Sequence, residues 1–267
     1  MLRKCPTVAD LRALKGKRQL TMLRIFTIEE AAAAEAAAID IVSAPIELVS
    51  HPRYREVAPG LFSMTGVDHR AAGTREDYLR FAGRALMAGA DALYCSGGLE
   101  TVRFLAQEHI PVVGHVGLVP SRNTWTGGFR AVGKTADQAL ALYDECLAYE
   151  NAGAFAVEIE VVPEAVATEI SRRMKKLLLW SMGAGAGCAV QYLFAMDILG
   201  EHTEHMPRHS KVYRNFAAEH ERLQQERIAA FTEFRRDVES GAFPEPRHLV
   251  SISDTELMNF RAGLPGE

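Results

Sequence analysis

The feature of this sequence that most constrains its fold is a repeated alternation between short apolar segments and longer helical segments. The apolar segments are rich in β-branched side chains, which is typical of buried parallel strands. The expected strands are residues 19–26, 39–43, 60–65, 91–95, 111–118, 154–160, 176–181 and 197–200. Eight strands that alternate with helices predict an α/β fold of the (β/α)8 (TIM) barrel type, for which 267 residues is an ordinary length. A doubly wound open sheet is the alternative, because the eighth expected strand is weak.

The predicted barrel forms a single domain over residues 1–267. It begins with a helical lead-in over residues 1–17 and ends with helices and a tail over residues 211–267. Apolar residues in the charged C-terminal helix are expected to pack outside the barrel or against a neighbouring subunit. These residues are Phe216, Leu223, Ile228 and Phe231.

Charge and cysteine usage narrow the possible partners and location. The net charge of −4 gives no reason to expect nucleic acid or an anionic membrane as a partner. The four cysteines have no CxxC spacing, so neither a zinc site nor a disulfide framework is expected. The run Leu177–Met196 carries no formal charge, but its glycines divide it into a strand, a turn and a helix rather than a membrane span. Reduced thiols and a cytoplasmic location are the expectation.

Polar residues stand at the carboxyl ends of several expected strands, which in a barrel face one pocket. The central one is His115, which lies toward the carboxyl end of the apolar run Pro111–Leu118, and a long loop over residues 119–134 follows this run. A lone histidine beside a strand is as often a hydrogen-bonded core residue, but the other polar strand ends favour a functional role. The residues predicted to contact a substrate are Arg24, Ser43, Tyr94, Ser96, His115 and Ser181.

Two carboxylates, Glu158 and Glu160, share one face of the sixth expected strand because side chains alternate along a strand. A carboxylate in an apolar strand is costly unless it is paired or hydrogen-bonded. Glu160, the last residue of the strand, is the predicted general base. For Glu158 a position directed to the surface is an equally good explanation. The Gly183–Gly185 turn after the next strand would bring backbone N–H groups to the pocket, although such turns often serve packing only.

Several segments of this sequence carry a resemblance when they are taken together. They are Gly114–Pro120, Gly127–Gly133, Val157–Pro163, Met182–Gly185, His205–Phe216 and Val238–Pro244. In this order and spacing they resemble the ketopantoate hydroxymethyltransferase (3-methyl-2-oxobutanoate hydroxymethyltransferase) family, which is part of the phosphoenolpyruvate mutase/isocitrate lyase superfamily of barrels. The resemblance runs from about residue 18 to residue 246.

The resemblance implies an aldol-type transfer reaction. Members of the family enolise 3-methyl-2-oxobutanoate and add the one-carbon unit of 5,10-methylenetetrahydrofolate, with Mg²⁺ as cofactor, and they assemble as decamers. Glu160 matches the family's general base, His115 its substrate-contacting histidine, and Ser181–Gly185 the glycine turn beside the substrate. The implied partners are a small 2-oxo acid and further copies of the chain.

The sequence departs from the family at the metal site. Ala44 and Met64 stand where the resemblance places metal-binding aspartates, and Tyr94 and Ser96 stand where it places a lysine and a glutamate. Mg²⁺ is anchored in proteins by carboxylate oxygens. We therefore expect the family's magnesium site to be absent, with no metal-ligating residue assigned, unless Glu47 replaces one of the aspartates.

Two hypotheses follow. In the first, the protein is a diverged enzyme that forms or breaks C–C bonds in a small 2-oxo acid. Glu160 would act as base, and hydrogen bonds from Tyr94, Ser96 or backbone amides would replace the metal. In the second, it is a non-catalytic paralogue that binds a small ligand or acts in assembly. The retained Glu160 and His115 favour the first hypothesis, and the lost metal ligands favour the second or an altered reaction.

Overall fold

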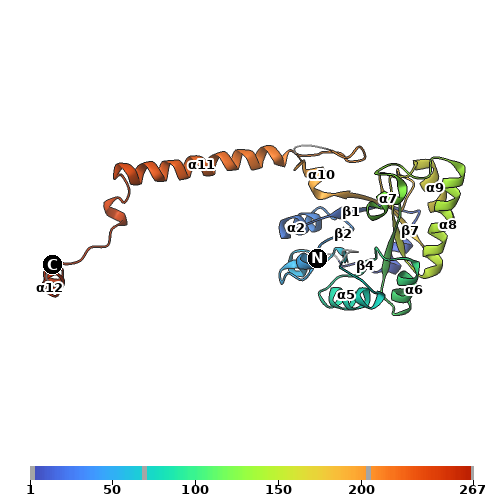
Figure 1. Ribbon diagram of the computed structural model, residues 1–267, viewed down its shortest axis with the longest axis horizontal. Coiled ribbons are helices and arrows are strands. Elements are labelled where there is room, and N and C mark those ends of the chain that lie inside the picture. The colour runs from blue at the N-terminus through green and yellow to red at the C-terminus, as the bar shows by residue number, and fades with distance from the viewer. Residues whose placement is uncertain (1–3, 68–70, 203–205, 266–267) are drawn as a thin grey trace. The chain divides into compact units, whose positions relative to one another are not determined.

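The computed structural model describes residues 4–67, 71–202 and 206–265, and the chain divides into two compact units, Met1–Arg214 and Asn215–Glu267. In the first unit, eight parallel strands pair in chain order to form a closed barrel, which confirms the predicted (β/α)8 fold (Figure 1). The strands are β1 (Leu20–Arg24), β2 (Ile41–Ser43), β3 (Phe62–Gly66), β4 (Ala92–Tyr94), β5 (Val112–Gly117), β6 (Ala156–Glu160), β7 (Leu178–Met182) and β8 (Val190–Phe194).

Several helices of this unit begin at threonine caps that the sequence supplies. Thr27 and Thr74 each accept a hydrogen bond from the third helical residue, whose carboxylate bonds back to the threonine backbone. The helices are α1 (Val8–Ala13), α2 (Ile28–Ala36), α3 (Ile46–Val49), α4 (Tyr54–Val57), α5 (Arg75–Met87), α6 (Leu99–Gln107), α7 (Asn123–Thr126), α8 (Ala136–Ala152), α9 (Glu164–Arg173) and α10 (Ala195–Leu199), with a 3-10 turn η1 (Pro120–Arg122).

Alternation along the strands separates two apolar cores. One set of side chains points outward and packs against the surrounding helices, as Val42 and Val157 do. The other set fills the barrel, where the ring of Phe155 meets the rings of Phe62 and Trp180 edge to face. Leu11 of α1 joins this inner set beside Leu20, the first residue of β1. Helix α1 therefore closes the amino end of the barrel, and the carboxyl ends of the strands are left for a site.

The eighth strand lies earlier in the chain than predicted. Residues 190–194 form β8 and pair with β1 along its whole length, whereas residues 195–199 form α10 and Gly200 caps that helix. The helix predicted after the glycine turn is wrong for the same reason, because the chain passes directly from the turn into β8. The segment Val190–Phe194 lacks regular polar alternation, so its period did not distinguish a strand from a buried helix.

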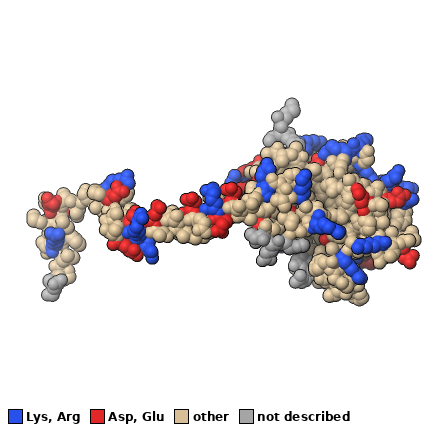
Figure 2. All heavy atoms as spheres, turned by 90° about the horizontal axis from the view of Figure 1, so that it is seen from above, with Lys and Arg blue, Asp and Glu red and all other residues tan. Residues whose placement is uncertain are grey.

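The second unit contains α11 (Phe216–Ser240), a 3-10 turn η2 (Pro246–His248) and α12 (Asp254–Ala262). Helix α11 confirms the helix predicted in this part of the chain. The apolar residues predicted to pack there are exposed in the single chain, from 37% for Phe216 to 73% for Phe231. Packing against a neighbouring subunit therefore stays a prediction. Figure 2 shows acidic and basic side chains interspersed along this unit.

Among the described residues, no helix combines the length and the apolar character that crossing a membrane requires.

Candidate functional site

A large cavity of about 1520 Å³ opens at the carboxyl ends of the barrel strands. Six of the seven residues predicted to act on a substrate line it, and only Ser181 does not. The six are Arg24, Ser43, Tyr94, Ser96, His115 and Glu160. They come from five different strands or strand ends, so closure of the barrel brings together groups that are up to 136 residues apart in the sequence (160 − 24).

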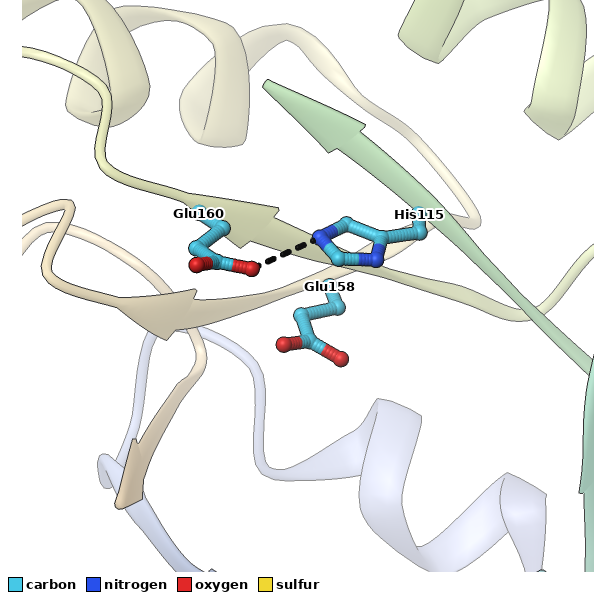
Figure 3. Close-up of side chains that lie close together, drawn as sticks. All are labelled: His115, Glu158 and Glu160. Atoms are coloured by element: carbon cyan, nitrogen blue, oxygen red, sulfur yellow. Dashed lines mark ion pairs between the residues drawn. The ribbon is translucent and has the colours of Figure 1, made fainter. Parts of the chain in front are cut away.

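His115 stands between the polar groups of this cavity. The register of β5 and β6 places it directly opposite Glu158. Its Nε2 lies 3.1 Å from Oε2 of Glu160, the ion pair marked by the dashed line in Figure 3. The two atoms are not aligned for a hydrogen bond, so Nε2 of His115 has no hydrogen-bond partner among the described residues. Nδ1 lies 2.6 Å from Oη of Tyr94, and this contact fixes the orientation of the imidazole ring.

Glu160 is held at the end of β6 by a strained backbone. The next residue, Val161, has a φ of 50°, a left-handed conformation that β-branched residues rarely adopt. Its N–H donates to the carbonyl of Met182 at 2.8 Å, and its carbonyl accepts from the N–H of Val132 at 3.2 Å. Such a conformation costs about 1–3 kcal/mol and persists where the surroundings enforce it, often at functional sites.

The structure decides the open question about Glu158, whose side chain points into the barrel and not to the surface. It is only 7% exposed and lines the cavity. Figure 3 shows it below the pair formed by His115 and Glu160, and the donor atoms of the three residues lie within 4.8 Å of one another. Within the described part of the chain, the Glu158 carboxylate forms no hydrogen bond or ion pair. A surface-directed Glu158 was therefore the wrong alternative.

Burial and neighbouring charges set the protonation of these groups. Burial raises the pKa of Glu158 above its usual range, an effect that a charged His115 opposes and the charge of Glu160 reinforces. Burial by itself would lower the pKa of His115, but the two carboxylates outweigh it and the pKa is raised. Burial also raises the pKa of Tyr94 well above its usual range, so that Tyr94 remains a neutral phenol.

Arg24 contributes a positive charge to the wall of the cavity. Its Nη1 donates to Oγ of Ser43 at 2.7 Å, and its guanidinium lies over the ring of Phe26, 5.1 Å from the centroid. Tyr192 of β8, which is 4% exposed, completes this wall and also bonds to Ser43. Arg24 forms no ion pair with any described residue. Its remaining N–H groups can therefore bind an anion in the planar, two-pronged geometry that suits a carboxylate.

Ser181 and the glycine turn do not reach the cavity. The Ser181 hydroxyl donates to the carbonyl of Gly185 at 2.9 Å and accepts from the N–H of Ala184 at 3.1 Å. Glu164 accepts from the N–H of Ala186 and packs against Gly185, where a Cβ would collide with its side chain. The turn thus serves local packing, the alternative that the sequence left open.

Comparison with known proteins adds sequence similarity to this geometry. The family model described as ketopantoate hydroxymethyltransferase matches residues 69–246. The 3-methyl-2-oxobutanoate hydroxymethyltransferase of Nitratidesulfovibrio vulgaris is 30% identical over 97% of this chain and 89% of its own. The chain belongs to the ketopantoate hydroxymethyltransferase family. Its members are transferases, and the one from Cenarchaeum symbiosum is 37% identical over 64% of each chain.

Solved structures show the same fold at lower identity. Phosphonopyruvate hydrolase, in a complex with oxalate and Mg²⁺, has a TM-score of 0.51 and 14% identity over 96% of this chain and 95% of its own. Phosphoenolpyruvate phosphomutase from Streptomyces platensis has a TM-score of 0.51 and 13% identity over 96% of each chain. These neighbours share the barrel fold of this chain.

The magnesium site implied for the ketopantoate hydroxymethyltransferase family does not fit this member. Ala44 and Met64 occupy the two expected aspartate positions as fully buried apolar side chains. Glu47, which could have replaced one of these aspartates, is an exposed residue of α3 at the edge of the cavity. The cluster around Glu158 contains an imidazole, which Mg²⁺ disfavours relative to carboxylate, carbonyl and water oxygens.

Sequence reasoning missed part of the wall of this cavity. Tyr192 and Phe194 line it from β8, and Met182 lines it from the end of β7. Tyr192 and Phe194 share a face because side chains alternate along a strand, but this alternation becomes usable only once pairing with β1 has located β8. The same alternation, applied from Glu160 to Glu158, identifies the second buried carboxylate.

Proposed function

We propose that this protein enolises a small branched 2-oxo acid and adds a one-carbon unit to it, as the names of its relatives indicate for 3-methyl-2-oxobutanoate. The observation that carries the proposal is the convergence of a carboxylate, Glu160, and an unpaired cation, Arg24, on one cavity. An oxo acid needs both groups, because its carboxylate must be anchored while the C–H bond beside its carbonyl is broken.

Glu160 is the proposed base. Its carboxylate is paired with His115, a titratable side chain, rather than with a permanently charged arginine or lysine. The contact between Tyr94 and His115 holds the imidazole in place, and the strained turn at Val161 holds Glu160. A general base at a fixed distance from the carbon acid is what proton abstraction requires.

Arg24 is the proposed anchor for the substrate carboxylate. One hydrogen bond to Ser43 and stacking on Phe26 restrict its guanidinium before any ligand arrives. A restricted cation loses less side-chain entropy on binding than a free one. With its carboxylate bound to Arg24, a small oxo acid would extend toward the cluster of His115, Glu158 and Glu160.

The one-carbon donor is proposed to be 5,10-methylenetetrahydrofolate, from the family resemblance. When bound, it supplies the one-carbon electrophile. The cavity is larger than a five-carbon oxo acid needs, and Phe129 and Asn123 line its outer part with an aromatic ring and an amide. These residues suit the flat, hydrogen-bonding ring system of a pterin.

The test is exchange of the C3 proton of 3-methyl-2-oxobutanoate, followed by NMR in D₂O. We expect the purified protein to catalyse the exchange and Glu160→Gln to lose it by about 10²–10⁴-fold, the usual contribution of a general base. Glu108→Gln is the matched control, because Glu108 is exposed next to α6 and lies outside the cavity. Exchange that survives in Glu160→Gln would remove Glu160 from the base role. Binding of the oxo acid without any exchange would instead favour the non-catalytic alternative.

A further inference from the structure

Glu158 is a second carboxyl group that the proposed base chemistry leaves unused. It lies two residues before Glu160 on the same face of β6, and therefore one layer deeper in the barrel. It is more buried than its neighbour, and no described side chain bonds to it. A buried, unpartnered carboxylate is costly, so the position calls for a proton, a ligand or both.

The surroundings of Glu158 separate its role from that of Glu160. Oε2 of Glu160 lies against His115, whereas the carboxylate of Glu158 points away from that pair in Figure 3 and lines the cavity. Across β6 and β7, Glu158 is paired in register with Trp180, whose ring is fully buried. The titratable or charged groups that face it come from five strands and are Arg24, Tyr94, His115, Glu160 and Tyr192.

We propose that Glu158 is a carboxylic acid that donates its proton to the oxo oxygen of the substrate while Glu160 removes the proton from C3. The inference rests on the proposed function and adds the electrophilic group that this site otherwise lacks. Burial raises the pKa of Glu158, which keeps the acid form available at neutral pH. A buried acid next to an ionised carboxylate is a recurring way to separate the acid and base roles.

The step balances within the two carboxyl groups. Glu160 takes the proton of C3, and the electrons of that C–H bond form the C2–C3 double bond. The π electrons of the carbonyl move to its oxygen, which forms an O–H bond with the proton of Glu158. Glu160 becomes an acid and Glu158 a carboxylate, so the net charge does not change. When C3 attacks the one-carbon electrophile, the enol O–H bond breaks, the carbonyl re-forms and Glu158 regains its proton.

Two hydroxyl donors of the cavity are already engaged. Oη of Tyr94 is in contact with Nδ1 of His115, and the hydroxyl of Ser96 lies 3.2 Å from Oη of Tyr78. Glu158 is an acidic group without such a partner, so it can meet a carbonyl oxygen that lies between Arg24 and Glu160.

Infrared spectroscopy tests the protonation of Glu158 without any turnover. We expect the carbonyl stretch of a protonated carboxyl group at neutral pH in the wild type and in Glu160→Gln, and its absence in Glu158→Gln. Adding 3-methyl-2-oxobutanoate, or oxalate as a planar mimic of the enolate, should move the band to lower frequency because the acid then donates a hydrogen bond. A wild-type spectrum without the band, or a band that no ligand moves, would overturn the proposal.

The kinetic test separates donation from structural support. Glu158→Leu removes the donor and should lower the maximal rate of C3 exchange by about 10²–10³-fold, as the loss of one oxyanion donor does. Glu158→Gln retains a donating amide and should be intermediate, and the substrate concentration for half-maximal rate should change little in both. Glu108→Gln again serves as the control. Exchange at the wild-type rate in Glu158→Leu would contradict the catalytic role.

The two proposals fail in different ways. If the wild type shows no exchange but ligands still move the infrared band, the proposed function fails and the assignment of Glu158 as a donor stands. If exchange occurs but the wild type binds one Zn²⁺ per chain and Glu158→Gln does not, then Glu158 acts as an ionised ligand and the assignment fails.

Discussion

Glu158 and Glu160 belong to one strand and are chemically identical, yet their surroundings differ. Glu160 ends the strand beside His115, and Glu158 lies a layer deeper without a partner. The position of Glu160 at the cavity follows from the sequence, because the last residue of a barrel strand faces the pocket. The direction of Glu158 does not follow, since it depends on which residue begins the strand.

The burial of Glu158 predicts a dependence of stability on pH. Because the folded pKa is raised above the unfolded value of about 4.3, the folded state holds the proton longer as pH rises and stability falls between those two values. Glu158→Gln removes this pH-dependent loss of stability, because glutamine does not titrate. We expect the melting temperature of the variant minus that of the wild type to increase from pH 5 to pH 8.

The raised pKa of His115 acts in the same direction, since stability is also lost as pH rises through that value. Removing Glu158 weakens this shift and reinforces the expected trend. Thermal unfolding of wild type, Glu158→Gln and Glu108→Gln over this pH range measures it. A difference that stays constant with pH would mean that Glu158 is ionised at no cost.

At the scale of elements, the contact between β5 and β6 positions His115 against both carboxylates. Gly117 ends β5 with a φ of 84°, and a Cβ there would lie 2.5 Å from the carbonyl oxygen of Glu160. The strand ends can approach this closely only because the residue lacks a side chain.

Replacing Gly117 with alanine should therefore destabilise the barrel by about 1–3 kcal/mol, through backbone strain and displacement of Glu160. The matched control is Gly83→Ala in α5, where a Cβ would meet no atom within 4 Å. It should be neutral or stabilise the protein by up to about 1 kcal/mol. Denaturant unfolding of both variants measures the effects, and equal stability of Gly117→Ala and wild type would refute this account of the β5–β6 contact.

The elements differ in how well the sequence predicts them. Strands β1 to β7 follow from apolar runs bounded by caps and glycines, and the threonine capping boxes fix the starts of α2 and α5. Strand β8 did not follow, because its run Val190–Phe194 has no polar alternation and only pairing with β1 distinguishes it from a helix. The burial of Ser181 within its own turn could not be predicted from the sequence either, because it depends on hydrogen bonds that form only after the turn folds.

At the scale of the molecule, the second unit exposes more apolar side chains than a solvated helix pair requires. Phe231 and Phe234 of α11 are 73% and 57% exposed. Exposed apolar patches of this kind mark interaction surfaces, and the family resemblance implies a homo-oligomer.

We expect sedimentation at a mass several times that of one chain, and a smaller assembly for Phe231→Glu combined with Phe234→Glu. Gln224→Glu, on the same helix, controls for added charge. A wild-type protein that sediments as a monomer would contradict the prediction.

The central claim is that this barrel enolises a 2-oxo acid with its own side chains, in place of the metal that the family resemblance implies. The most direct measurement is the rate of C3 proton exchange in 3-methyl-2-oxobutanoate, with protein stripped by EDTA and again after Mg²⁺ is restored. The account predicts exchange at the same rate under both conditions. Exchange that appears only with Mg²⁺ would contradict this prediction. It would show that residues at positions other than 44 and 64 bind magnesium in the cavity.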